Sequence, residues 1–222
     1  MSVPDLAPAQ VQVVPTPRGD GRLHVSRAED PSAVLLLSHG AGGGVEARDL
    51  VALADFLPAQ GITVARFEQP WRVAGRKIAT APPTLDEAFV AAAATLTLDV
   101  PLVVGGRSAG ARSACRCAPG LGAAGVLALS FPLHPPGRPE KSRIEELRGT
   151  GCTTLVVQGE RDTMGRPDEF PRDLVDVDFA VVPGADHAMK VPVRGPVSSE
   201  EAMAIIVEST LEWIVREVAG NR

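Results

Sequence analysis

Three observations predict that the chain folds as an α/β protein with a doubly wound, mostly parallel sheet. From residue 33 onward, apolar segments of strand length alternate with segments of helical pattern, and a parallel neighbour can be reached only through such a long connection. The strand segments are continuously apolar, which indicates that helices cover both faces of the sheet. Because 222 residues suit one domain, we expect a single domain over residues 1–222, with residues 1–10 as a flexible N-terminal segment.

The first two strands differ from the rest. The segments "VQVV" (11–14) and "RLHVS" (22–26) are separated by Pro, Gly and Asp residues that are typical of a turn. Strands joined by so short a connection pair antiparallel. We therefore expect an N-terminal antiparallel hairpin beside the parallel strands.

The alternation of strands and helices continues to the C-terminus. The expected strands are "AVLLLS" (33–38), "ITVARF" (62–67), "PLVVGG" (101–106), "GVLALSFP" (125–132), "TTLVVQGE" (153–160) and "DFAVVPGA" (178–185), and the expected helices cover 47–60, 84–97, 108–118 and 199–218. Irregular stretches at 68–83 and 134–143 each follow a strand end. Such loops contact ligands in α/β sheets.

The composition argues against several classes of protein. The formal charge is −5, and the chain lacks the Lys and Arg runs of a nucleic-acid surface. No stretch approaches about 18 apolar residues, and the N-terminus lacks a basic region followed by an apolar one. We expect a cytoplasmic protein that binds neither nucleic acid nor membrane. Cys115, Cys117 and Cys152 are odd in number, so we expect reduced, mostly buried thiols and no metal site.

The segment "GGRSAGARSA" (105–114) contains the candidate nucleophile. Residues 106–110, Gly-Arg-Ser-Ala-Gly, fit the pattern G-x-S-x-G directly after an apolar strand. This pattern is the nucleophile elbow of α/β-hydrolases, a strand-to-helix turn so tight that small residues must flank the serine. It favours Ser108 as a nucleophile.

Candidates for the base and the acid follow later strands. A serine nucleophile needs a base within hydrogen-bond reach, and the base needs an acid that holds its tautomer. In α/β-hydrolases the chain order is Ser, then Asp or Glu, then His. Asp162 follows "TTLVVQG" and His187 follows "FAVVP", so we predict a triad of Ser108, Asp162 and His187. Glu160 and Asp186 are the alternative acids.

The other histidines are less well placed for the role of base. His24 lies in the hairpin, His39 lies in "SHGAGG", and His134 lies in a proline-rich loop. None of them follows the last strand. The position after the last strand favours His187 as the base.

The Gly-rich segment "HGAGGG" (39–44) is the candidate oxyanion hole. It follows the strand "VLLLS", and N–H groups of such a turn can point at a developing negative oxygen, joined by the N–H of the residue after the nucleophile. We assign the donors to Ala41 or Gly42 together with Ala109. Neither G-x-x-x-x-G-K-[ST] nor G-x-G-x-x-G occurs in this stretch, so no cofactor is expected.

These segments resemble a known family. The chain is similar to compact, dienelactone-hydrolase-like proteins of the α/β-hydrolase superfamily, and closest to the family of the testis-expressed hydrolase-like proteins and the third subunit of the NSL histone-acetyltransferase complex. The matching segments are "LLSHGAGG", "VARFEQPWRVAGRK", "VVGGRSAGARSA", "LVVQGERDTMG" and "PGADHAMKV". The resemblance implies Ser108 as nucleophile, Asp162 as acid, His187 as base, and the "HGAGG" loop with Ala109 as the oxyanion site. No lid-sized insertion interrupts the strands, which disfavours long-chain lipid substrates.

These features predict a cofactor-independent serine hydrolase that cleaves a small carboxylic ester or thioester through an acyl-enzyme. Two alternatives stay open: a catalytically silent α/β-hydrolase-like binding protein or complex subunit, and a small peptidase. The fold alone does not choose among them, since α/β-hydrolases host many chemistries. The complete triad favours the enzyme, and the oligomeric state is not predicted.

Candidate substrate contacts lie in the irregular stretches and beside the triad. They are Trp71, Arg72, Arg107 and Lys190, with Arg76 and Lys77 nearby. Cations at the mouth of the site favour an anionic ester. The alternative is that Arg107 and Arg112 pair with acids such as Glu68 and brace the elbow. Residues 131–133 are expected to add apolar lining.

Overall fold

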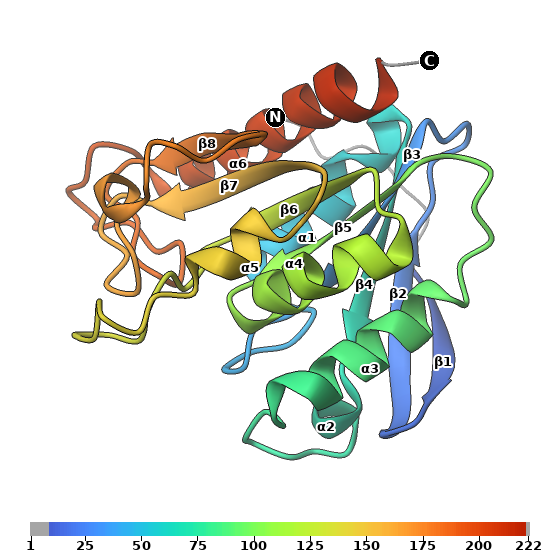
Figure 1. Cartoon of the computed structure of the whole chain (residues 1–222). Coiled ribbons are helices and arrows are strands. Elements are labelled where there is room, and N and C mark those ends of the chain that lie inside the picture. The colour runs from blue at the N-terminus through green and yellow to red at the C-terminus, as the bar shows by residue number, and fades with distance from the viewer. Residues whose placement is uncertain (1–8, 221–222) are drawn as a thin grey trace.

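The computed structural model describes residues 9–220, in which eight strands form one sheet (Figure 1). The strands are β1 (Gln10–Thr16), β2 (Gly19–Ser26), β3 (Ala33–Ser38), β4 (Ile62–Glu68), β5 (Leu102–Arg107), β6 (Gly125–Leu129), β7 (Thr153–Gly159) and β8 (Val177–Val182). Their order is β1-β2-β4-β3-β5-β6-β7-β8. The pairs β1–β2 and β2–β4 are antiparallel, and all other pairs are parallel. The predicted hairpin and mostly parallel sheet are confirmed.

Helices cover both faces of the sheet, so the doubly wound prediction is also confirmed. The helices are α1 (Arg48–Phe56), α2 (Pro70–Val73), α3 (Pro82–Ala93), α4 (Ala109–Leu121), α5 (Ile144–Arg148) and α6 (Ser199–Trp213), with 3₁₀ turns η1 (Pro58–Gln60) and η2 (Pro167–Glu169) and a π-helical end η3 (Ile214–Ala219). Helices α3, α4 and α5 pack on one face, and α1 and α6 pack on the other (Figure 1).

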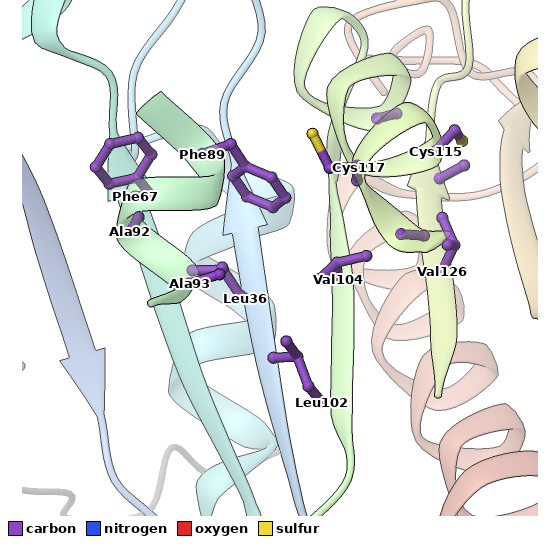
Figure 2. Packing of buried hydrophobic residues seen from close by; sticks show 14 of the residues in the cluster. Leu36, Phe67, Phe89, Ala92, Ala93, Leu102, Val104, Cys115, Cys117 and Val126 are labelled. Atoms are coloured by element: carbon purple, nitrogen blue, oxygen red, sulfur yellow. The ribbon is translucent and has the colours of Figure 1, made fainter. Parts of the chain in front are cut away.

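Alternation along the central strands fills the two halves of the core. On β3, Val34 and Leu36 face the cluster under α3 and α4, whereas Leu35 and Leu37 face the cluster under α1 and α6. Figure 2 shows Leu36 near Phe89 of α3 in the first cluster. Every residue of β3 is buried, which explains why the strand is apolar throughout rather than at alternate positions.

Several expected boundaries were wrong for local reasons. The helix expected over 47–60 ends at Phe56, because Pro58 cannot donate a helical hydrogen bond and starts η1 instead. The strand expected over 125–132 ends at Leu129, where Ser130 takes a left-handed φ of 46°. The C-terminal helix changes to π geometry at Ile214.

The irregular stretches were only partly predicted. The stretch 68–83 contains the short helix α2, which begins at Pro70, and the start of α3, since a proline suits the first turn of a helix. The stretch 134–143 leads into α5, which was not predicted. The expected flexible segment 1–10 lies outside the described residues up to residue 8, and Gln10 already pairs with Val25 in the hairpin.

The described part of the chain has no helix with the length and apolar character that crossing a bilayer requires. Residues 130–152, between β6 and β7, hold α5 and no lid domain. The carboxyl ends of the parallel strands are therefore left without a covering domain from this connection, and it is there that the predicted site residues gather.

Candidate active site

The turn from β5 to α4 places Ser108 at the start of a helix. Its backbone has a φ of 54° and a ψ of −111°, an uncommon conformation for a residue with a side chain. The Ser108 N–H donates to the Leu129 carbonyl of β6 at 2.9 Å, and Ala109 is the first residue of α4. The serine therefore sits at the junction between the sheet and a helix N-terminus.

Two glycines make this turn possible. A Cβ atom on Gly106 or Gly110 would collide with the carbonyl oxygen of Ser38 at the end of β3. Because the turn lies against the backbone at the end of β3, only glycine fits at these two positions. The G-x-S-x-G pattern is thus a packing requirement in this chain.

The structure brings the three predicted triad residues into one hydrogen-bonded row. His187 Nε2 lies 3.0 Å from Ser108 Oγ, and His187 Nδ1 lies 2.8 Å from Asp162 Oδ2. An imidazole with its proton on Nδ1 donates to Asp162 and leaves Nε2 free to accept from the serine hydroxyl. Asp162 follows β7 and His187 follows β8, so three separate strand ends supply the row.

Asp162 is fully buried, and other groups satisfy its carboxylate besides the histidine. Oδ1 accepts the Met164 N–H at 2.8 Å, and Oδ2 accepts from Gln158 Nε2 at 2.9 Å. The same Gln158 amide donates to the carbonyls of Gly165 and Phe131 at 2.8 and 3.2 Å. A buried carboxylate needs such donors. They hold the Asp162 carboxylate in one orientation, with Oδ2 toward the imidazole of His187.

The two alternative acids have other partners. Glu160 Oε2 accepts the N–H of Gly184 at 2.6 Å. Asp186 Oδ1 accepts the N–H groups of Ala188 and Lys190 at 2.8 and 2.9 Å. Both carboxylates therefore stabilise the backbone of the loop after β8.

The other three histidines are held elsewhere. His24 Nε2 on β2 lies 3.7 Å from Glu68 of β4. His134 Nε2 lies 2.8 Å from Glu169, in the turn that follows the acid. His39 directly follows β3, and both nitrogens of its ring lie within hydrogen-bond distance of backbone groups.

The contacts of His39 hold the start of the Gly-rich loop. Its Nδ1 lies 2.9 Å from the Gly40 carbonyl, and its Nε2 accepts the Gln69 N–H at 3.1 Å. Burial lowers the pKa of His39, which favours the neutral ring that this acceptor role requires. A Cβ on Gly40 would lie 3.4 Å from Ser108 Cβ, so the loop touches the nucleophile.

The predicted oxyanion donors belong to two backbone segments that meet at the serine. Ala41 and Gly42 lie in an exposed turn directly after Gly40. Ala109 begins α4, and N–H groups in the first turn of a helix have no partner within that helix. The assignment of these N–H groups as oxyanion donors stays a prediction.

The predicted substrate contacts have mixed positions. Trp71 is only 4% exposed and packs edge-on against His39, with ring centroids 5.4 Å apart, so its ring supports the Gly-rich loop. Arg72 Nη2 pairs with Glu46 Oε1 at 3.0 Å. Lys190 is exposed after the histidine. Residues 131–133 are buried rather than lining an open wall.

Arg107 and Arg112 each pair with an acid, as the alternative expects, but neither acid is the suggested Glu68. Arg107 Nε pairs with Asp49 Oδ2 at 2.8 Å, and Arg112 binds Glu146 through two hydrogen bonds of 2.8 and 2.6 Å. Glu68 instead lies beside the hairpin. Asp49 was not singled out from the sequence. The sequence signal that could have identified Asp49 is a charged residue next to Leu50 on the buried side of α1.

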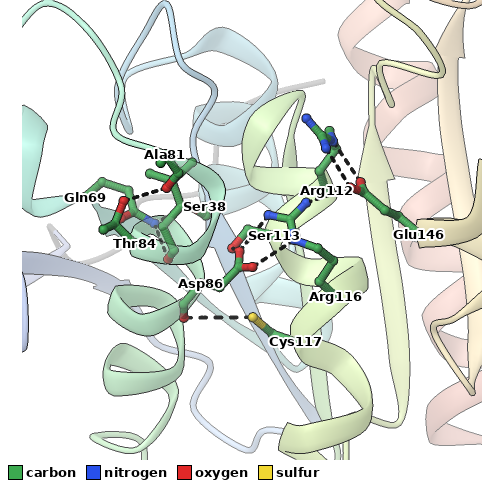
Figure 3. A network of polar contacts seen from close by, with 11 residues as sticks. Ser38, Gln69, Ala81, Thr84, Asp86, Arg112, Ser113, Arg116, Cys117 and Glu146 are labelled. Carbon is green, nitrogen blue, oxygen red and sulfur yellow. Dashed lines mark hydrogen bonds and ion pairs between the residues drawn. The ribbon is translucent and has the colours of Figure 1, made fainter. Parts of the chain in front are cut away.

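A charged network ties α4 to α3 and α5 (Figure 3). Arg116 binds Asp86 of α3 at 2.7 and 2.8 Å and Glu146 of α5 at 3.0 Å. Ser113 Oγ donates to Asp86 at 2.6 Å, and Arg112 shares Glu146. These contacts join three helices on one face of the sheet.

Neither metal nor thiol chemistry is indicated for the part of the chain that the structure describes. No group of three or more His, Cys, Asp or Glu side chains there is placed to hold a metal ion. The three cysteines are free. Burial raises the pKa of the Cys117 thiol to about 11, which disfavours the reactive thiolate.

A family model described as "Alpha/beta hydrolase domain" matches residues 31–215. The chain belongs to the alpha/beta hydrolase domain family. Membership supports a hydrolase and agrees with the position of the serine at the turn after β5. No curated protein sequence matches the chain.

Solved structures share the alpha/beta hydrolase fold at low sequence identity. An alpha-beta serine hydrolase homologue from Coxiella burnetii is 17% identical, with a TM-score of 0.74 over 92% of this chain and 98% of that one. A serine hydrolase without lid from Xanthomonas campestris is 16% identical, with a TM-score of 0.71 over 96% of each chain. A dienelactone hydrolase from Anabaena variabilis is 16% identical, with a TM-score of 0.71 over 96% of this chain and 100% of that one.

The contact between the elbow and β3 predicts a large difference between two glycines of α4. Gly110→Ala should destabilise the protein by about 1–3 kcal/mol, since its Cβ would meet the Ser38 carbonyl. Gly120→Ala is the control, because a Cβ there has open space and alanine favours a helix over glycine. Urea denaturation measures both free energies of unfolding. Equal stability of the two variants would contradict the proposed packing.

The pair of His134 and Glu169 predicts how stability depends on pH. The pKa of His134 is raised from 6.5 by its hydrogen bond with the Pro135 carbonyl and then by Glu169. The contribution of His134 to the free energy of unfolding is therefore complete at pH values below its pKa in the unfolded chain. It is lost as pH rises through its pKa in the folded protein. The pKa of Glu169 is lowered from 4.5 by the Arg166 N–H and then by His134, so its contribution is lost as pH falls through the folded pKa.

We expect wild type to exceed His134→Gln in free energy of unfolding by more at about pH 5.5 than at about pH 8.5. Chemical denaturation at both pH values measures this difference. Glu169→Gln should reduce the same pH dependence. If wild type exceeds His134→Gln in free energy of unfolding by the same amount at both pH values, the predicted pH dependence of this pair is wrong.

Proposed function

We propose that the chain is a cofactor-independent serine hydrolase that cleaves small carboxylic esters or thioesters through an acyl-enzyme. The observation that carries the proposal is the row of hydrogen bonds from Ser108 through His187 to buried Asp162. Such a row makes a serine hydroxyl nucleophilic, because the base accepts its proton while the acid stabilises the charged ring. Family membership and the position of the serine support the same activity.

In the acylation step, Ser108 Oγ attacks the substrate carbonyl carbon and its proton passes to His187 Nε2. The carbonyl oxygen becomes a tetrahedral oxyanion, which the N–H of Ala109 and an N–H of Ala41 or Gly42 stabilise. As the intermediate collapses, His187 returns the proton to the leaving alcohol or thiol. The products are a Ser108 acyl-enzyme and the free leaving group.

In the deacylation step, water attacks the acyl carbon and His187 takes one of its protons. The second tetrahedral intermediate uses the same oxyanion donors. Its collapse expels Ser108, which recovers its proton from His187. The acid product leaves, and Asp162 keeps the same hydrogen bond throughout because both its oxygens are engaged.

The proposed substrates are small. The connection between β6 and β7, residues 130–152, adds one short helix and no lid, and two similar structures are a serine hydrolase without lid and a dienelactone hydrolase. A site without a covering domain offers little apolar surface for a long acyl chain. The exposed cation of Lys190, three residues after His187, favours an anionic ester among these substrates.

From the sequence alone, we also propose that the protein acts on a small-molecule ester, binds neither nucleic acid nor membrane, and is located in the cytoplasm. The narrower similarity to the testis-expressed and NSL-subunit proteins stays a prediction, together with the silent binding protein that it suggests.

Fluorophosphonate labelling and ester hydrolysis test the proposal together. Intact-mass analysis of wild type should show one adduct, and p-nitrophenyl acetate and butyrate should be hydrolysed. Ser108→Ala should abolish the adduct and lower turnover by on the order of 10³-fold or more, since the nucleophile is gone. Ser209→Ala, a serine of α6 outside the triad, is the matched control and should leave both readouts unchanged.

Other results would point to the alternatives. A folded wild type with neither adduct nor turnover would contradict the proposal and favour the silent binding protein. Cleavage of short peptides without hydrolysis of either ester would favour the peptidase.

A further inference from the structure

Arg107 precedes the serine in the elbow, yet its side chain is directed into the protein. The side chain is 16% exposed, and its Nε pairs with Asp49 Oδ2 at 2.8 Å. Its Nη2 donates to the backbone carbonyl of His187 at 2.7 Å. One guanidinium thus joins the elbow, the first turn of α1 and the loop that carries the imidazole.

The pair with Asp49 is a buried one. Asp49 lies in the first turn of α1 and is 2% exposed. Burial raises the pKa of Asp49, and the charge of Arg107 opposes that rise. A buried carboxylate without a partner is strongly destabilising, so Asp49 holds the guanidinium in one orientation.

Arg107 also borders the Gly-rich loop. A Cβ on Gly40 would lie 3.3 Å from the Arg107 carbonyl oxygen and 3.9 Å from Arg107 Nη1. The loop runs from the end of β3 to α1, where Asp49 is anchored. The guanidinium therefore lies beside the start of the proposed oxyanion loop and pairs with the helix that follows it.

We propose that Arg107 is a positioning residue that holds the His187 loop and the Gly40 loop at a fixed separation around Ser108. The inference rests on the proposed function and assigns Arg107 a role other than binding substrate. Guanidinium geometry suits the task, because its planar fork places rigid donors toward two acceptors at once. A lysine offers a flexible point charge in its place.

Apart from the bond between His187 and Ser108, the other polar contacts of the loop with His187 lead to the end of β7. Glu160 accepts the Gly184 N–H, the Arg161 N–H donates to the Ala185 carbonyl at 2.8 Å, and Asp162 binds the imidazole. Asp186 binds N–H groups within the same loop, and Met189 is buried in the core. The bond from Arg107 to the His187 carbonyl connects this loop directly to β5. Misplacing a reacting group by about 1 Å lowers rates by roughly 100-fold, so a small shift of the loop has a large effect.

The test compares three variants at Arg107 and one control variant with wild type. Arg107→Met removes both contacts, and Arg107→Lys keeps the charge for Asp49 without the fork. The double variant Asp49→Asn/Arg107→Met removes both charges, so that no unpaired carboxylate is left to unfold the protein. Arg112→Met is the matched control: it breaks another ion pair of an arginine near the elbow, and Glu146 keeps Arg116 as a partner.

Three measurements separate positioning from stability and from substrate binding. They are kcat and KM for p-nitrophenyl butyrate, the midpoint of thermal unfolding, and the downfield proton NMR signal of the imidazole proton between His187 and Asp162. We expect kcat to fall by roughly 10- to 100-fold in Arg107→Met and in the double variant, with KM within about twofold. Arg107→Lys should keep the midpoint of thermal unfolding of wild type but should have a lower kcat than wild type. The downfield signal should weaken with kcat, and Arg112→Met should keep kcat and the signal.

Each opposite result overturns the inference. A rise in KM with kcat unchanged would assign Arg107 to substrate binding, and kcat losses that follow the thermal midpoint equally in Arg107→Met and Arg112→Met would assign it to stability alone. If wild type shows neither labelling nor turnover, the proposed function fails. The downfield signal then still decides whether Arg107 holds the histidine, because it requires no substrate.

Discussion

Backbone contact between the β5–α4 turn and the end of β3 is the constraint on which the site depends. Gly106 and Gly110 leave no room for a side chain against the Ser38 carbonyl, and the Gly-rich loop starts immediately after Ser38. The nucleophile and the proposed oxyanion donors thus both depend on this contact between the ends of two neighbouring strands. Because β3 and β5 are paired in the middle of the sheet, the position of the contact follows from strand register.

Two buried carboxylates hold His187, one through its side chain and the other through its backbone. Asp162 binds the imidazole directly, whereas Asp49 acts through Arg107, which donates to the His187 carbonyl. Each carboxylate has partners that offset the cost of its burial. The base is therefore held through its side chain and its backbone together. Asp162 follows β7, Arg107 ends β5, and Asp49 lies in α1, the helix after β3.

Local patterns in the sequence predicted the sheet, the hairpin and the three residues that meet at the elbow. Tight turns and buried strands leave such patterns because steric limits act on neighbouring residues. The pairing of Arg107 with Asp49 was not predicted, since the two lie on different elements and ion pairs have no sequence signature. Trp71 was expected to contact substrate, and the packing of its buried ring edge-on against His39, after α2 begins at Pro70, was not predicted. The helix α5 is too short to show a helical period.

The position of β8 at the sheet edge has a consequence for heating. Within residues 9–220 this strand pairs only with β7, and Phe179 and Val181 on it are exposed. Elements with few buried contacts open locally at lower cost than the centre of a sheet. Since His187 follows β8 whereas Ser108 follows the central strand β5, local opening separates the imidazole from a serine whose turn is still folded. Inactivation is then an event of the sheet edge, distinct from global unfolding.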